Sequence, residues 1–351
     1  MDNFEKQFEA LEARHIVALE TADIAGLKTA QVAALSATQA PSLSTADIVA
    51  FSSTQVAALS TSAIRALDTA QLLALETADI AALLTSQVTA LQDAQLRALP
   101  DTDLRVLKSA QVAALSSAQL LALGTYGIEA LTSSQVIAIS PANIAALTEA
   151  QIGALNQSAF LALRTNQIAA LTGSQIVQGL STDDFAGMST AQIAALTTAQ
   201  LAFLGTDDIV ALTTAQVGVL TTSQVQALDA AQLLALETRD LVAMKTAQVQ
   251  AFLPSQIEVL GTNQLSVLTT TQVAALTTAQ WAVIDPREVG ALTTAQVASI
   301  PTASLSALSP DQVEALGTGA VAALKSAQIA SLSVDQLVRF STDEIALLST
   351  A

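Results

Sequence analysis

Apolar side chains recur at every eighth position along almost the whole chain. One of these positions, the anchor, falls at every eighth residue from Leu11 to Leu171. After one extra residue in the stretch LTGSQIVQGL, it resumes at Leu180 and continues to Leu348. Of the 43 anchors, 35 are Leu, and the others are Phe, Ile or Met. A position that is apolar in every unit predicts a buried side chain.

The other seven positions of the octad are almost as regular, as the stretch LTTAQVGVLTTSQVQAL at residues 212–228 illustrates. We number each octad from its anchor, which is position 1. Position 2 is variable and polar, position 3 is mostly Thr, Ser or Pro, and position 4 is usually Ala. Position 5 is Gln or Asp, position 6 is Val, Ile or Leu, and position 8 is small. The consensus is L-x-T-A-Q-V-x-A.

A single continuous helix cannot bury these anchors. Eight residues at about 100° each rotate successive anchors by about 80°, so the chain must break once in every octad. Thr or Ser at position 2 or 3, followed by Gln, resembles a capping box when counted from position 2. The prolines at position 3 fit the first residue of a helix (Pro141, Pro254, Pro286 and Pro310). The pattern predicts about one and a half turns of capped helix per octad, followed by a corner.

Helices this short are stable only when they stack on neighbours. We therefore predict an all-α, elongated solenoid of very short capped helices. Asp replaces Gln at position 5 at intervals that are often 24 residues, which indicates about three octads per coil (Asp23, Asp47, Asp79, Asp103, Asp184, Asp208 and Asp240). A β-solenoid is the alternative, because Thr, Val and Ile favour strands. Abundant Ala, Gln and Leu, with little Gly or Asn at the corners, favour helices.

The two ends of the chain depart from the repeat. Residues 1–18 are predicted to form an N-terminal capping helix and the first octad, with charged residues around Phe4 and Phe8. Residues 19–351 form the octad solenoid, with a one-residue frame slip near residues 171–180. The C-terminal stretch LLSTA contains no capping pattern, so we expect an uncapped end that can dock another copy.

Charge and composition limit the classes of molecule that the protein is expected to bind. The net charge of −17 repels nucleic acid and anionic membrane surfaces. The chain is 52% hydrophobic and 3% aromatic, and its mean hydropathy is +0.52. A polar residue nevertheless interrupts every octad, so no apolar run of about 18 residues exists, and we expect no membrane insertion. The N-terminus has no apolar core of a signal peptide. The absence of Cys excludes disulfides and thiolate metal sites.

No group of residues indicates catalysis. His15 is the single histidine, and it occupies position 5 of its octad, where a polar surface role is expected. Without Cys or a second His, the sequence offers no Cys–His pair and no histidine metal set. We predict that the protein is not an enzyme and has no catalytic, cofactor-binding or metal-binding residues.

Some irregular stretches of the sequence allow other functional interpretations, which the residues favour less. STDDF (181–185) and GTDDI (205–209) could bind calcium at corners, but they lack a spaced ligand series and fit better as carboxylates at helix N-termini. IDPREVGAL (284–292), which follows Trp281, is either a contact point or a tolerated variant octad. Stacked Thr rows could form an ice-binding ladder, although helix capping is the simpler role.

Two resemblances bear on these units. The stretch LSPDQVEAL (308–316) is similar to the first short helix of the repeats in TAL effectors, which implies a capped helix beginning at the S-P-D-Q residues. The second helix and the base-reading loop of that family are missing. With the acidic net charge, we do not expect DNA reading.

More broadly, the run of L-x-T-A-Q-V-x-A units resembles octad arrays of large bacterial surface proteins, adhesin-like or surface-layer-like. That resemblance implies an extracellular or cell-surface location and no catalytic residues. We expect a structural protein that associates end to end, as a self-associating rod, a filament or a surface-layer subunit. The alternative is an adhesive or spacer module whose acidic or Thr-rich face binds a protein, glycan, calcium or ice.

Overall fold

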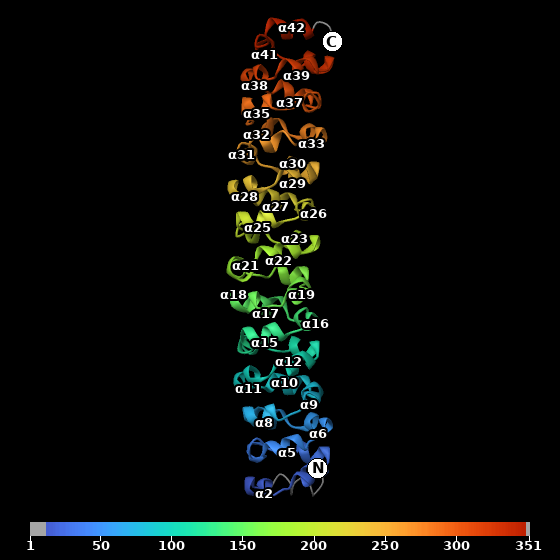
Figure 1. Ribbon diagram of the computed structural model, residues 1–351, viewed down its shortest axis with the longest axis vertical. Coiled ribbons are helices and arrows are strands. Elements are labelled where there is room, and N and C mark those ends of the chain that lie inside the picture. The colour runs from blue at the N-terminus through green and yellow to red at the C-terminus, as the bar shows by residue number, and fades with distance from the viewer. Residues whose placement is uncertain (1–11, 349–351) are drawn as a thin grey trace. The chain divides into compact units, whose positions relative to one another are not determined.

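The computed structural model describes residues 12–348, and it divides the chain into two compact units. Unit 1 ends at Leu180 and unit 2 begins at Ser181. Of the predicted N-terminal capping helix, residues 1–11 lie outside the described residues. Every described helix is short, as the octad pattern predicts (Figure 1).

The helices of unit 1 are α2 (Ala13–Val17), α3 (Thr21–Gly26), α4 (Thr29–Ala33), η1 (Ala40–Ser42), α5 (Thr45–Val49), α6 (Ser53–Ala58), α7 (Thr61–Ala66), α8 (Thr69–Leu73), α9 (Thr77–Ala82), α10 (Thr85–Ala90), α11 (Asp93–Ala98), α12 (Asp101–Val106), α13 (Ser109–Ala113), α14 (Ser117–Ala122), α15 (Gly124–Ala130), α16 (Ser133–Val136), α17 (Pro141–Ala146), α18 (Glu149–Gly153), α19 (Gln157–Leu161), α20 (Thr165–Ile168) and α21 (Gly173–Gly179).

The helices of unit 2 are α22 (Thr182–Gly187), α23 (Thr190–Ala195), α24 (Thr198–Leu201), α25 (Thr206–Ala211), α26 (Thr214–Val217), α27 (Thr222–Ala227), α28 (Ala230–Ala235), α29 (Thr238–Ala243), α30 (Thr246–Ala251), α31 (Pro254–Ile257), α32 (Thr262–Leu265), α33 (Thr270–Ala275), α34 (Thr278–Trp281), α35 (Pro286–Gly290), α36 (Thr294–Val297), α37 (Thr302–Ser306), α38 (Pro310–Glu314), α39 (Thr318–Ala322), α40 (Ser326–Ala330), α41 (Val334–Leu337) and α42 (Thr342–Leu348).

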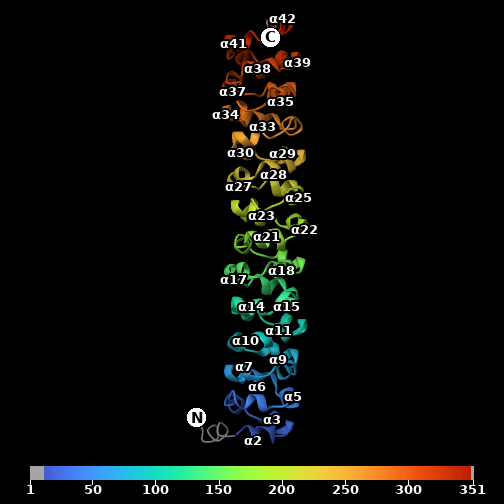
Figure 2. The same cartoon turned by 90° about the vertical axis from the view of Figure 1, so that its left-hand side faces the viewer.

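Three octads make one coil in both units. In unit 1, α10 packs on α7, and α12 packs on α9. In unit 2, α25 packs on α22, and α38 packs on α35. The partners start 24 residues apart, and Figures 1 and 2 show the coils of each unit following one another in chain order. The prediction of a helical solenoid is confirmed, and the β alternative is wrong, because residues 12–348 contain no strand.

The core of each unit consists of positions 1 and 6. Val56 and Leu59 in unit 1, and Val225 and Leu228 in unit 2, are all buried. Because these positions are three residues apart, they share one face of each short helix and its corner. Three large aromatic side chains, Phe160, Phe185 and Trp281, also occupy position 6 and are fully buried.

The corners are short extended segments. Leu59, the C-cap of α6, has φ −56° and ψ 138°, and Ser60, the N-cap of α7, has φ −64° and ψ 153°. Two extended residues turn the chain from one side of the coil to the next. The Ser60 hydroxyl then accepts a hydrogen bond from the backbone N–H of Ala63, so the new helix begins with a satisfied N-terminus.

One octad of unit 1 departs from this corner. Leu123 keeps a helical backbone, with φ −61° and ψ −24°, so α15 follows α14 without an extended link. Gly124 makes the change of direction instead, with φ +64°. Side chains other than Gly rarely adopt this left-handed conformation, which explains the glycine at position 2 of this octad.

The extra residue near 171–180 is absorbed inside a helix. Helix α21 has seven residues and ends at Gly179, which is buried against α18. A Cβ on Gly179 would lie 3.0 Å from the carbonyl oxygen of Glu149. The longer helix therefore packs only because its last residue has no side chain.

Candidate functional site: the glutamine ladder and the corner grooves

The Gln at position 5 is buried, and it links two successive coils. Gln87 is 1% exposed, and its Oε1 accepts the backbone N–H of Leu84, which completes the capping box of α10. Its Nε2 donates to the carbonyl oxygens of Val56 at 2.9 Å and Leu59 at 2.8 Å. Those carbonyls lie at the C-terminal end of α6, where the regular i→i+4 helical hydrogen bonds end, and the Val56 carbonyl also accepts the backbone N–H of Leu59. One side chain therefore satisfies the start of one helix and the end of another.

The same arrangement recurs through both units. In each case Nε2 donates to carbonyls that are 31 and 28 residues earlier in the chain. We call these side chains the glutamine ladder. Members with both bonds are Gln55, Gln71, Gln87, Gln95, Gln135, Gln167 and Gln175 in unit 1, and Gln216, Gln224, Gln232, Gln248, Gln256, Gln264, Gln272, Gln280, Gln312, Gln328 and Gln336 in unit 2.

The capping role of this Gln follows from sequence, but its inter-coil bonds do not. One signal was available. A capping box accepts Glu or Gln at its last position, yet Glu occupies position 5 only at Glu288 and Glu344. The preference for the amide indicates that a donor is needed as well as an acceptor.

Asp at position 5 contacts the preceding coil differently. Asp79 accepts the hydroxyl of Ser53 at 2.7 Å, and Asp103 accepts the hydroxyl of Thr77 at 2.8 Å. Each hydroxyl lies 26 residues earlier, at position 3. A carboxylate cannot donate to the helix-end carbonyls, so these octads exchange the amide bonds for a hydroxyl bond.

The residues considered for catalysis and calcium binding are helix caps. The exposed His15 accepts the backbone N–H of Glu12 through Nδ1. In STDDF, Asp184 accepts the backbone N–H and the hydroxyl of Ser181, and in GTDDI, Asp208 accepts the backbone N–H of Gly205. Burial raises the pKa of Asp208. Across residues 12–348, no three His, Cys, Asp or Glu side chains cluster closely enough to hold a metal ion.

The variant octad 284–292 is also built around a cap. Asp285 accepts the backbone N–H of Arg287, and Pro286 is the first residue of α35. Gly290 packs closely on the next coil, since a Cβ there would lie 2.7 Å from the carbonyl oxygen of Ala315. Trp281 is fully buried, and it belongs to the core of unit 2.

Adjacent threonines at positions 2 and 3 have different roles. Thr221 is the N-cap of α27, and its hydroxyl accepts the backbone N–H of Gln224 at 3.2 Å. Thr222 follows as the first helical residue and is exposed. Capping therefore accounts for the first Thr of the pair.

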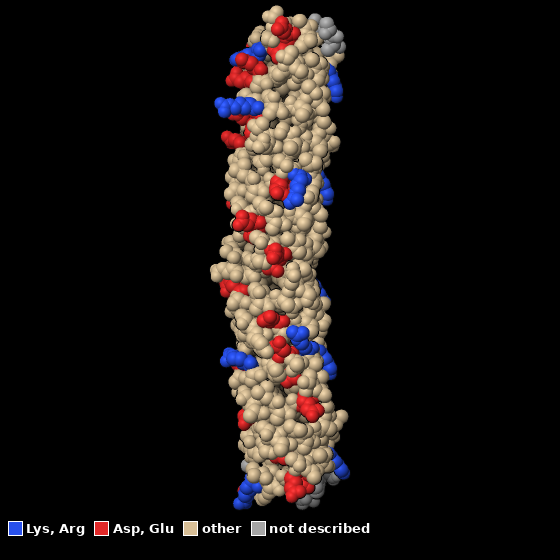
Figure 3. Space-filling view, in the orientation of Figure 1, with Lys and Arg blue, Asp and Glu red and all other residues tan. Residues whose placement is uncertain are grey.

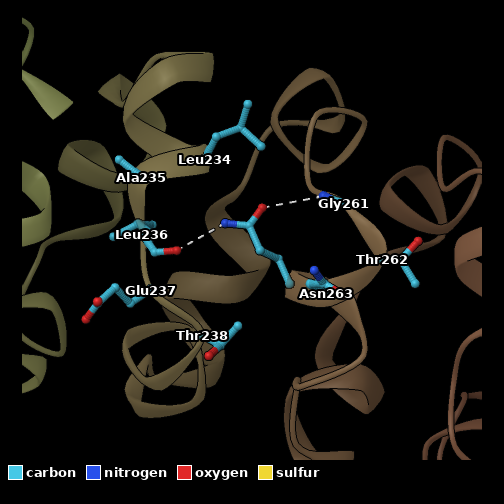
Figure 4. A pocket seen from close by; sticks show the side chains of 9 residues that line it. Leu234, Ala235, Leu236, Glu237, Thr238, Gly261, Thr262 and Asn263 are labelled. Carbon is cyan, nitrogen blue, oxygen red and sulfur yellow. Dashed lines mark hydrogen bonds between the residues drawn. The ribbon is translucent and has the colours of Figure 1, made fainter.

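Shallow grooves form where a corner of one coil faces the helix start of the next. The groove in Figure 4 has a volume of about 600 Å³. Its walls are the corner at Leu234–Thr238 and the start of α32 at Gly261–Asn263, with Gln264 between them. A groove of about 590 Å³ is lined by residues from Arg65 to Gln119, and two smaller ones, of about 340 and 280 Å³, are lined by residues from Arg105 to Ser158 and from Gln226 to Val259. They offer amide, hydroxyl and carboxylate groups but no arranged set of catalytic groups.

Charge is distributed thinly over the face of the molecule that Figure 3 draws. On the face drawn in Figure 3, acidic and basic side chains lie singly or in small groups, separated by uncharged surface. Such a surface provides no concentrated field for a charged ligand. The search for membrane-spanning segments among the described helices found none that is long and apolar enough.

These features define a helical repeat protein in which the glutamine ladder links successive coils within each unit. A family model, the ALTTAQ repeat, matches residues 16–53, 40–75, 101–133, 177–214, 204–238, 233–270, 281–318 and 313–350. The matches cover well over half of the chain, so the chain belongs to the ALTTAQ repeat family. No curated protein matches the sequence. The family match concerns the repeat itself, and the likenesses to TAL effectors and to bacterial surface proteins stay predictions.

Proposed function

We propose that this protein is a non-catalytic structural subunit whose copies associate end to end, as a filament or surface layer at a bacterial cell surface. The supporting observation is that the same kind of contact recurs between successive coils within each unit. Positions 1 and 6 pack on the same positions of the next coil, and position 5 reaches back to its helix ends. A surface that is complementary to the next copy of itself can extend without closing.

The last described coil of unit 2 carries such a surface. Ile345 occupies position 6 in α42 but is 44% exposed, and Ile329 and Leu337, at the same position in α40 and α41, are only half-buried. In the preceding coils of unit 2 this position is buried. A further coil supplied by a second copy would cover these three side chains.

The proposal is tested by the association of the purified chain in neutral buffer. We expect sedimentation velocity to show concentration-dependent growth and electron microscopy to show uniform filaments. Ile345→Asp should abolish growth, because burying an unpaired carboxylate in the contact is costly. Val242→Asp is the matched control, because the Val242 side chain is 43% exposed at position 7 of α29, and only its backbone carbonyl, which the substitution keeps, meets Gln272 of the next coil. A chain that stays monomeric at all concentrations would refute the self-association.

A binding module is the second candidate, favoured by the recurrent corner grooves. In this role, the grooves near Gly261 and Gln119 would hold short polar segments of a protein or glycan. Binding to a glycan array that is lost in a variant with a filled groove, such as Gly261→Phe, would support it. Unchanged binding in that variant would exclude the groove as the site.

A further inference from the structure

Asp240 is a buried carboxylate whose neighbouring donors, the Thr214 hydroxyl and the backbone N–H of Glu237, do not reach ordinary hydrogen-bond geometry. It lies at position 5 in α29 of unit 2, its side chain is 0% exposed, and neither of its oxygens has a hydrogen-bond partner. Asp79 and Asp103, at the same position in unit 1, each accept a hydroxyl from the preceding coil. Thr214 takes the place of these hydroxyls in the coil before Asp240, but its hydroxyl makes no hydrogen bond of ordinary geometry with the carboxylate.

The neighbours of Asp240 provide little compensation. Arg239 Nε lies 4.0 Å from Asp240 Oδ1, and the Arg239 guanidinium is mostly exposed and also pairs with Glu237. The helices that pack against α29 are α26 and α32, with sequences TAQV and TNQL, and neither carries a titratable side chain. Within residues 12–348, the charged groups that act on this carboxyl are Arg239 and Glu237.

The register of the glutamine ladder shows which groups an amide would meet here. Gln232 donates to the carbonyls of Leu201 and Leu204, and Gln248 donates to those of Val217 and Leu220. Counted back from Asp240, the same separations of 31 and 28 residues lead to the carbonyls of Ile209 and Leu212. An ionised carboxylate at this place turns acceptors toward those carbonyls, and a buried charge is costly when its nearby donors, the Thr214 hydroxyl and the Glu237 N–H, compensate it only in part.

We propose that Asp240 is a proton-dependent contact between two coils of unit 2. In the neutral form, the O–H of Asp240 supplies a donor toward the preceding coil, in place of the amide that Gln would provide. Ionisation removes that donor and weakens the contact between α29 and the corner at residues 209–214. Burial raises the pKa of Asp240, and the Thr214 side chain and Arg239 oppose this only in part.

The sign of the pH dependence follows from this shift. A carboxyl whose pKa is higher in the folded state holds its proton more tightly there than in the unfolded chain. Its contribution to stability is therefore most favourable at acidic pH, and it declines as pH rises from the ordinary carboxyl range through the folded-state pKa.

The test compares wild type with Asp240→Asn, in which an amide replaces the carboxyl with almost unchanged shape. Urea unfolding is followed by the fluorescence of Trp281, the single Trp of the chain, which is buried in unit 2. We expect the urea midpoint of Asp240→Asn to exceed that of wild type at pH 8, and the two midpoints to converge near pH 4.5. A constant difference across this range, or a lower midpoint for the variant at pH 8, would overturn the proposal.

Asp184→Asn is the matched control in the same unit, because Asp184 already accepts two hydrogen bonds from Ser181. Its midpoint should not rise at pH 8. Asp240→Gln, which restores the consensus, is a second variant with the same expected rise at pH 8. If Asp240→Asn fails to fold, the same result with Asp240→Gln supports the proposal, and a lowered midpoint for Asp240→Gln opposes it.

Discussion

Gly153 and Gly179 lie so close together that a Cβ on Gly153 would be 3.1 Å from the carbonyl oxygen of Gly179. These residues end α18 and α21, which are successive on one side of unit 1. The octad that ends at Gly179 contains the one extra residue of the repeat. The extra residue of this octad is thus accommodated where the backbones of Gly153 and Gly179 lie close together.

Gly179→Ala should lower the free energy of unfolding of unit 1 by about 1–3 kcal/mol, because the new methyl group would meet the Glu149 carbonyl oxygen and the Ile152 side chain. Chemical unfolding followed by circular dichroism measures the change. Gly26→Ala is the control, since a Cβ there has open space and Ala favours the helix by about 0.5–1 kcal/mol. Equal effects in both variants would contradict the tight contact.

Gln87→Glu should destabilise unit 1 by about 1–3 kcal/mol at neutral pH, because a carboxylate then faces the carbonyls of Val56 and Leu59 without a donor. Circular dichroism during urea unfolding is the measurement. The same substitution at the exposed Gln178 should change stability by less than about 0.5 kcal/mol. A loss at Gln87 no larger than at Gln178 would show that the inter-coil bonds add nothing.

Glu288→Gln should stabilise unit 2 by about 0.5–1.5 kcal/mol at neutral pH, because it adds the missing donor to the ladder. Burial raises the pKa of Glu288, and the charge of Asp285 adds to the rise. The stability of wild type is therefore closest to that of Glu288→Gln at acidic pH, and the advantage of the variant should grow as pH increases. The fluorescence of Trp281 during urea unfolding measures this difference in stability between Glu288→Gln and wild type at each pH. Glu258→Gln, at an exposed position, should show no such trend.

Thr221→Ala should cost about 0.5–2 kcal/mol, because the backbone N–H of Gln224 loses its cap. Thr222→Ala, one residue later, removes an exposed hydroxyl and should have little effect. Thermal unfolding of the two variants separates the roles of adjacent threonines. If Thr222→Ala were the more damaging change, the assignment of position 2 as the cap would be wrong.

Much of the fold is encoded locally and could be predicted. The break once per octad follows from helix geometry, and the capped starts follow from Thr, Ser and Gln at fixed positions, as at Ser52 and Gln55. The coil of three octads was visible in the spacing of Asp79 and Asp103. These features depend on residues within one octad or on a simple repeat between octads.

The ladder could not be predicted in full, because its acceptors are backbone carbonyls. Any residue can provide the carbonyl that Gln87 meets at Val56, so the partner leaves no trace in the sequence. The missing partner of Asp240 and the unusual corner at Gly124 depend likewise on local packing and backbone angles. The repeat pattern predicts the average octad, whereas these are departures from it.

The fixed reach of the glutamine ladder has a consequence for how the chain folds. Each coil contact closes a loop of about 28–31 residues, wherever it lies in a unit. The entropy lost on closing such a loop is nearly the same at every step. Growth can therefore begin at any well-formed coil and proceed outward by equal increments. The number of octads can change by whole coils without creating a new kind of interface, so length is a quantity that mutation can adjust separately from fold.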